Sequence, residues 1–170
     1  LVTLLLEHWK LMTKPLLYLS LFLKRHRSEY YRRLNAVRIE GEWEPWLDFF
    51  LDGVATISEE ATASARDLFA LVAADRERVL AHEAVSVAAV RLFESLPRHP
   101  IVTVTSAMKL LDTSKPTVAR AIDMLVAVDI LKESTGKKRH RSFAYHKYLD
   151  QLRDETELGS TSSPLATLSP

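Results

Sequence analysis

TVTSAMKLLDTSKPTVARAIDMLVAVDILKESTGKKRHRSFAYHKY, residues 103–148, is the stretch that decides the fold of this chain. Its first part predicts a helix, because apolar residues recur on one stripe: Ala107, Leu110 and Leu111. A tight turn follows at residues 112–114, whose short polar side chains favour turns and can cap a following helix. Lys115 and Pro116 then suit a first helical turn, where the missing N–H of proline costs nothing.

The second predicted helix carries one buried face and is followed by a hairpin. The buried face comprises Val118, Ile122, Leu125 and Val126, while Lys115, Thr117, Arg120 and Met124 are expected to point elsewhere. Residues 130–133 and 142–145 have the pattern of short strands, and a basic segment, 135–141, connects them. Helix, turn, helix and a hairpin with a basic tip form the layout of a winged helix-turn-helix.

The charge of the chain is concentrated in this stretch. The whole protein of 170 residues has a formal net charge of only +1. Residues 97–149, however, carry 10 basic and 4 acidic side chains, a net charge of +6. A basic block confined to such a segment is typical of a phosphate-binding surface. The chain contains no cysteine, which excludes disulfides, thiolate metal sites and a cysteine nucleophile.

The rest of the sequence predicts a mainly α protein in four parts. Residues 1–96 read as an all-α region of five or six helices, and residues 97–100 as a linker around two prolines. Residues 101–152 form the winged helix-turn-helix, and residues 153–170 are expected to be a disordered tail. The apolar start of the chain is interrupted by charges well before the roughly 20 residues that a membrane span needs. We therefore expect a cytoplasmic protein without a membrane partner.

Two segments resemble the Fic family of protein adenylyltransferases. TKPLLYLSLFLKRHRSEYY (13–31) and LNAVRIEGEWEPWLDFFLDGVA (34–55) are similar to the part of a Fic protein that follows its catalytic loop. The segment ending TGKKRHRSFAYHKYL (135–149) resembles the winged C-terminal domain of many bacterial Fic proteins. The resemblance covers residues 1–152 and implies a truncated, Fic-like helical core followed by a winged helix-turn-helix.

The resemblance also implies which activity the family has and which parts are missing here. Fic proteins transfer AMP from ATP to a hydroxyl side chain of a target protein, using the motif His-Pro-Phe-x-Asp-Gly-Asn-Gly-Arg and a divalent metal. That motif does not occur in this sequence, so no catalytic residue and no metal ligand is assigned. ATP and Mg²⁺ would belong to a catalytic part that this chain lacks, and we expect the chain alone to be inactive.

The expected function is therefore recognition. The residues that we expect to contact double-stranded DNA lie on the second helix and on the wing: Ser114, Lys115, Thr117, Arg120, Lys137, Lys138, Arg139 and Arg141. The alternative is that the winged domain docks a protein target or a dimer partner. A stand-alone DNA-binding regulator that has lost its enzyme part, and a degenerate reading frame, are further hypotheses.

Two aromatic groups in the first 96 residues have an alternative interpretation. Trp43, Trp46, Phe49 and Phe50 could form a ligand platform, but we favour a hydrophobic core at a helix corner. The adjacent residues Tyr30 and Tyr31 are flanked by arginines on both sides, a mixture of aromatic and basic residues that some RNA-binding proteins have. Because glutamates such as Glu29 offset these arginines, we interpret the segment as an amphipathic scaffold helix.

Overall fold

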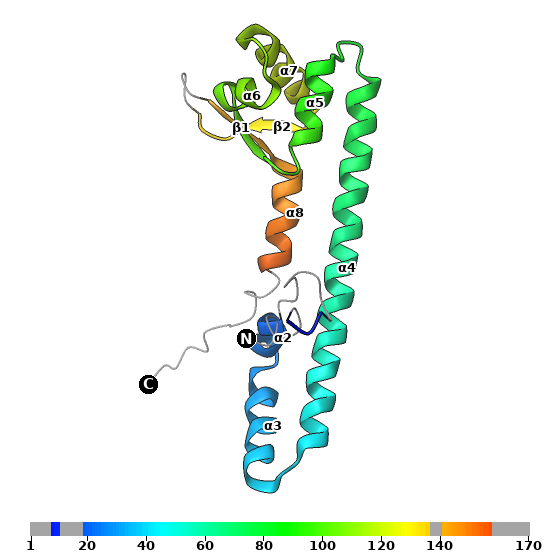
Figure 1. The fold of residues 1–170 in the computed structure, drawn as a ribbon, viewed down its shortest axis with the longest axis vertical. Coiled ribbons are helices and arrows are strands. Elements are labelled where there is room, and N and C mark those ends of the chain that lie inside the picture. The colour runs from blue at the N-terminus through cyan, green and yellow to red at the C-terminus, as the bar shows by residue number, and fades with distance from the viewer. Residues whose placement is uncertain (1–7, 11–18, 137–140, 158–170) are drawn as a thin grey trace, which may run out of the picture. The chain divides into compact units, whose positions relative to one another are not determined.

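The computed structural model describes residues 8–10, 19–136 and 141–157. This part of the chain is mainly helical and contains one small sheet (Figure 1). The chain separates into two compact units, one of residues 1–66 and 157–170 and the other of residues 67–156. A long helix, α4 (Trp43–Ala81), contributes to both units. Of the apolar start of the chain, only residues 8–10 belong to the described part.

The first unit contains α2 (Leu19–Arg25), α3 (Arg27–Glu40) and the beginning of α4. Helical hydrogen bonds continue across the junction of α2 and α3, where the N–H of His26 donates to Phe22 O over 2.9 Å. Gly41 ends α3 in a left-handed conformation with φ 72°, and its N–H donates to Val37 O over 3.1 Å. Glycine tolerates this conformation best, so the chain can reverse here into α4.

A small apolar cluster holds this unit together. Leu19, Phe22 and Ile57 are buried in it, and half-buried side chains surround them. The tightest contact in this cluster is between the Phe22 ring of α2 and the backbone of Gly53 in α4. A Cβ atom added at Gly53 would lie only 2.6 Å from Cδ1 of Phe22. Position 53 of α4 therefore requires a glycine, because the Phe22 ring occupies the space that a larger side chain would need.

The aromatic residues expected to form a core at the helix corner are only partly covered. Trp46 contacts Tyr30 with ring centres 5.7 Å apart and Phe49 at 6.1 Å, so a row of half-buried rings joins α3 to α4. Trp43 is 60% exposed. The expectation of a core is thus wrong for Trp43, which is the first residue of α4 and lies beyond that row of rings.

We predict that Gly53→Ala destabilises the protein by up to about 2 kcal/mol. A helical alanine normally gains about 1 kcal/mol over glycine, but here its methyl group must displace a buried ring, which typically costs about 1–3 kcal/mol. Urea denaturation measures the difference. The double variant Gly53→Ala/Phe22→Leu should recover part of the loss, and a stabilising effect of Gly53→Ala alone would contradict this packing.

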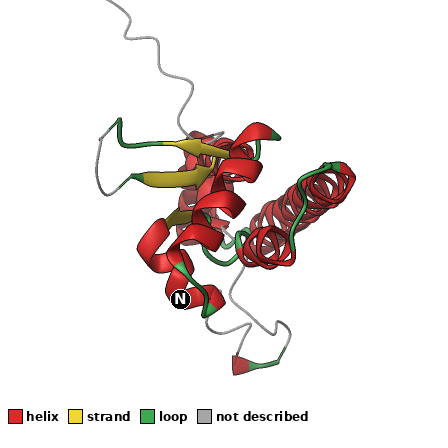
Figure 2. Ribbon diagram, turned by 90° about the horizontal axis from the view of Figure 1, so that it is seen from above, coloured by secondary structure: helices red, strands yellow, loops and turns green. Residues whose placement is uncertain are grey.

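The second unit begins with the last turns of α4 and continues through the rest of the chain. In order, its elements are α5 (Val87–Ser95), β1 (Ile101–Thr103), α6 (Val104–Leu111), α7 (Lys115–Ala127), β2 (Leu131–Glu133), β3 (Ser142–Tyr145) and α8 (His146–Glu157). The strands form an antiparallel sheet in the order β1-β3-β2 (Figure 2). Ile101 pairs with Ala144, and Leu131 pairs with Tyr145. The two predicted strands are present, and β1 is an additional one.

One hydrophobic core unites the helices and the sheet of this unit. α5 contributes Leu92 and Phe93, followed by Leu96, and α7 contributes the largest group of buried side chains. Residues 97–100 are consequently not a domain boundary. The boundary lies between residues 66 and 67, because α5 packs on α6 and α7 instead of on the first unit's cluster.

The end of the second unit also differs from the expectation. α8 continues to Glu157, so the first five residues of the segment expected to be disordered, 153–157, are helical. The helix begins directly after β3, and Tyr148 stacks on Tyr145 with ring centres 5.3 Å apart and planes 15° from parallel. This contact anchors the first turn of α8 to the core. Residues 158–170 lie outside the described part.

A fully buried carboxylate connects α4 to the sheet. Asp75 has no exposed surface, and its Oδ2 accepts a hydrogen bond of 2.7 Å from the Tyr145 hydroxyl. Its Oδ1 accepts a hydrogen bond from Arg78, whose other nitrogen donates to Val128 O over 3.2 Å. The N–H of Tyr145 donates to Pro100 O over 2.8 Å. One network therefore joins α4, the segment before β1, the end of α7 and β3.

We predict that Asp75→Ala destabilises the protein by about 2–4 kcal/mol, since it leaves a buried hydroxyl and a guanidinium without their acceptor. Tyr145→Phe should cost about 1–3 kcal/mol, because Asp75 then keeps a buried oxygen without a donor. Glu77→Ala is the matched control on the exposed side of α4 and should change stability by less than about 0.5 kcal/mol. Urea denaturation that shows equal effects for Asp75→Ala and Glu77→Ala would rule out this role.

Candidate nucleic-acid interface

The turn between α6 and α7 is built by local side-chain chemistry. Thr103 and Ser106 form a reciprocal capping box at the start of α6, with hydrogen bonds of 3.1 and 2.8 Å. Asp112 ends α6 in a left-handed conformation with φ 49°. Ser114 precedes α7 in an extended conformation, but its side chain accepts no backbone hydrogen bond. The expected cap is therefore absent, because the Ser114 hydroxyl pairs with the Thr117 hydroxyl at 2.9 Å.

The buried face of α7 is close to the predicted one but shifted. Val118, Ile122 and Leu125 are buried as expected. Met124 is also buried, whereas Val126 is 41% exposed, so both of these assignments were wrong. Met124 and Val126 lie on opposite sides of the apolar face formed by Val118, Ile122 and Leu125. Neighbouring residues bury only the side with Met124. Leu110 of α6, expected on a buried stripe, is 38% exposed.

The outward side of α7 begins with cationic and hydroxyl groups. Ser114, Lys115 and Arg120 are exposed, and Thr117 is half-buried. Neither Lys115 nor Arg120 has an ion-pair partner among the residues that the structure describes. Asp123 is exposed one turn after Arg120. The positive potential is therefore confined to the first half of the helix.

The arginine expected on the wing is engaged within the hairpin. Arg141 donates from Nε to Oε2 of Glu133 over 2.8 Å, and its guanidinium carbon lies 5.1 Å from the centre of the Phe143 ring. The hydrogen bond to Glu133 is the largest cause of the raised pKa of Arg141. Its charge is thus balanced by a neighbour. The other three wing residues, Lys137, Lys138 and Arg139, lie outside the described residues.

A second surface feature, not anticipated from the sequence, lies between β1 and α6. It is a shallow pocket of about 340 Å³, lined by His99, Ile101, Val102, Ser106, Lys109 and Leu110. Ile101 is 57% exposed there although it is a large apolar residue. The only sequence signal for it is the apolar Ile101 directly after the proline-flanked segment. An apolar floor with a basic rim suits a protein side chain better than a phosphate.

Among residues 8–10, 19–136 and 141–157, no group of three or more histidine, aspartate or glutamate side chains is placed to hold a metal ion. In the described residues no helix combines the length and apolar character needed to cross a membrane. Compared with models of known protein families, the sequence matches none.

Proposed function

We propose that residues 87–145 form a winged helix-turn-helix that binds double-stranded DNA with the beginning of α7. The order of elements supports this: helix, strand, two helices joined by a tight turn, and a hairpin. The observation that carries the proposal is the position of Lys115 and Arg120, which are exposed on the helix after the turn and have no ion-pair partner among the described residues. In the helix-turn-helix class the second helix lies in the major groove.

The proposed contacts divide into two kinds. Arg120 is the base-reading candidate, since a guanidinium can donate two hydrogen bonds to a guanine edge. Lys115, with the hydroxyls of Ser114 and Thr117, suits phosphate oxygens, which position the helix without reading sequence. Lys137, Lys138 and Arg139 complete the proposed phosphate contacts from the wing. Arg141 contributes less than we expected, because Glu133 already balances its charge.

We further propose that the chain is the C-terminal part of a Fic-like protein adenylyltransferase and supplies scaffold helices and recognition in the cytoplasm. The support is the similarity of residues 13–31, 34–55 and 103–149 to that family. The sequence has no residues that fit ATP and Mg²⁺ in the family's manner, because the catalytic motif is absent. No reaction step is therefore assigned to any residue of this chain.

The pocket at β1 and α6 favours a second candidate function, the recognition of a protein target or a dimer partner. Its apolar residues Ile101 and Leu110 are exposed, unlike most large apolar residues of this unit.

A stand-alone regulator that has lost its enzyme part would use the same α7 contacts with DNA. The DNA experiment below therefore tests the α7 interface both for such a regulator and for a part of a Fic-like protein.

We predict that Lys115→Ala/Arg120→Ala weakens DNA binding by at least tenfold. The loss of the Lys115 phosphate contact should also reduce the slope of log K against log salt by about 0.9, and the loss of Arg120 should relax the preference for one base. Duplex selection followed by fluorescence anisotropy at several salt concentrations measures these quantities. Arg91→Ala, an exposed arginine of α5, is the control and should change binding by less than about twofold. Equal binding by the double variant and the wild type would refute the α7 interface.

The Fic part of the proposal has its own test. We predict that this chain, incubated with labelled ATP, Mg²⁺ and a bacterial lysate, transfers no AMP to protein, since no base or phosphate-binding loop is present to position the reaction. Autoradiography provides the measurement. Transfer by the purified 170-residue chain would overturn the assignment of a purely non-catalytic role.

A further inference from the structure

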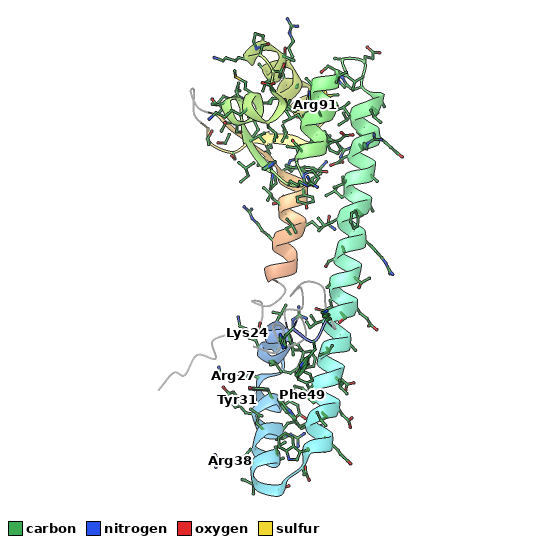
Figure 3. The ribbon with its side chains drawn as sticks, viewed as in Figure 1. Lys24, Arg27, Tyr31, Arg38, Phe49 and Arg91 are labelled. Atoms are coloured by element: carbon green, nitrogen blue, oxygen red, sulfur yellow. The ribbon has the colours of Figure 1, made fainter. Side chains whose placement is uncertain are left out.

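The outward side of α2 and α3 carries a second set of cations. Lys24, Arg27, Tyr31 and Arg38 follow one another at intervals of three, four and seven residues. At about 3.6 residues per turn these intervals place all four on one side of the helices. Figure 3 shows them on the side that faces away from α4, whereas Phe49 lies between α3 and α4. All four are exposed.

Three other arginines of this segment form ion pairs with glutamates, so we do not count them with the cations of the outward face. Arg25 donates to Glu60 over 2.8 Å. Glu29 accepts hydrogen bonds from Arg32 and Arg33, and these bonds lower its pKa to about 2, so Glu29 remains ionised at neutral pH. Glu29 and Glu60 therefore pair with Arg25, Arg32 and Arg33, and neither of them pairs with Lys24, Arg27 or Arg38.

The composition of the face is also distinctive. Glu29 and Glu40 are the only acidic residues between 19 and 40, and the helical period places both on the opposite side. The remaining residues that share the outward side are small and polar, namely Ser20, Ser28 and Asn35, with Leu34 at the edge. Over 14 residues this face extends for roughly 21 Å. It offers cations and hydrogen-bonding groups without a competing carboxylate.

Tyr31 adds an exposed aromatic ring in the middle of these cations. Its side chain is 56% exposed, and the Arg27 guanidinium carbon lies 5.7 Å from its ring centre. The preceding residue, Tyr30, points inward and packs on Trp46. The edge of Tyr30 supports Tyr31 at a ring distance of 5.2 Å. The two tyrosines therefore differ in role, one holding α3 to α4 and the other presenting a flat surface.

We propose that this face binds single-stranded nucleic acid. Lys24 and Arg27 contact phosphates at one end of the face and Arg38 contacts a phosphate farther along the strand, while a base between them stacks on Tyr31 next to Arg27. Interleaved cations and an exposed ring are the features of sequence-tolerant single-strand binding. An anionic membrane surface would require a row of apolar residues between the cations, and here those positions are serine and asparagine. The proposal is independent of the DNA-binding role of α7, because it concerns the other unit.

The test uses the full chain and fluorescein-labelled 12-nucleotide oligomers of uridylate and of thymidylate, with anisotropy measured at several salt concentrations. Three phosphate contacts predict a slope of log K against log salt of about −2, at about 0.7 per contact. Arg27→Glu/Arg38→Glu should weaken binding at least tenfold. Tyr31→Ala should weaken it at least fivefold through lost stacking, and Tyr31→Phe should restore it.

Two controls separate this face from other basic surfaces. Arg91→Glu reverses an exposed arginine of α5 (Figure 3), and Lys115→Ala/Arg120→Ala removes the α7 cations; both should change binding to the oligomers by less than about twofold. Circular dichroism verifies folding, and Arg27→Gln/Arg38→Gln replaces the charge reversal if that variant does not fold. If the affinities for the two oligomers agree within a few fold, the face recognises phosphate and base alone. A much higher affinity for the uridylate oligomer indicates that the ligand is RNA.

Several outcomes would overturn the proposal. These are no binding of either oligomer, unchanged binding by Arg27→Glu/Arg38→Glu and its glutamine counterpart, or loss of binding only when Lys115 and Arg120 are replaced. Binding to phosphatidylserine vesicles through this face, without binding to the oligomers, would assign the face to a membrane surface and would equally overturn it.

Discussion

The second unit depends on a carboxylate that is removed entirely from water. A carboxyl group in an apolar core is costly unless its oxygens form hydrogen bonds. Here Tyr145 and Arg78 satisfy both oxygens, and Tyr145 is itself fixed by Pro100 and by stacking on Tyr148. Burial raises the pKa of Tyr145, and the hydrogen bond to Asp75 raises it further. The hydroxyl thus remains a donor at neutral pH, and α4 is held to the sheet.

This network accounts for the extent of the unit and for the rigidity of its surface helix. Arg78 also donates to Val128 O, directly after α7, so the carboxylate on α4 restrains the end of that helix. The buried residues Val118, Ile122 and Leu125 restrain its inner side. Lys115 and Arg120 therefore project from a helix whose position is determined along its length. A rigid support of this kind is what precise recognition requires.

The distribution of ion pairs distinguishes the surfaces that can bind a polyanion. Arg141 is balanced by Glu133, Arg25 by Glu60, and Arg32 and Arg33 by Glu29. Among the described residues, Lys115 and Arg120 at the beginning of α7 have no such partner, and neither do Lys24, Arg27 and Arg38 on the outward side of α2 and α3. A count of charges along the sequence cannot make this distinction, since it depends on which acidic side chain reaches which basic one.

Much of the second unit could be predicted from the sequence. The period of the apolar residues indicated α6 and α7, and Lys115–Pro116 correctly marked the start of α7. The two strands after α7 were also predicted from their β-branched and aromatic residues. The all-α character of residues 1–96 was predicted too, and between residues 19 and 96 the structure contains only helices joined by short turns.

The features that the sequence did not reveal all depend on tertiary contacts. No local signal distinguishes Met124 from Val126, because whether a side of the apolar face is covered depends on the neighbouring helices. The break between α4 and α5 contains neither glycine nor proline; His82 and Ser86 make it with side-chain hydrogen bonds. The partner of Asp75 is 70 residues away in Tyr145, so neither residue shows its role in its own segment.

Native-state hydrogen exchange tests most directly whether the Asp75 network joins α4, the end of α7 and the sheet in one unit. The account predicts that the amides of residues 70–95 open with the same free energy as those of α7 and β3. Asp75→Asn should lower all of these values together and leave those of α2 and α3 unchanged. If the amides of residues 70–95 instead open with the same free energy as those of α2 and α3, and Asp75→Asn does not change it, Asp75 does not have this role.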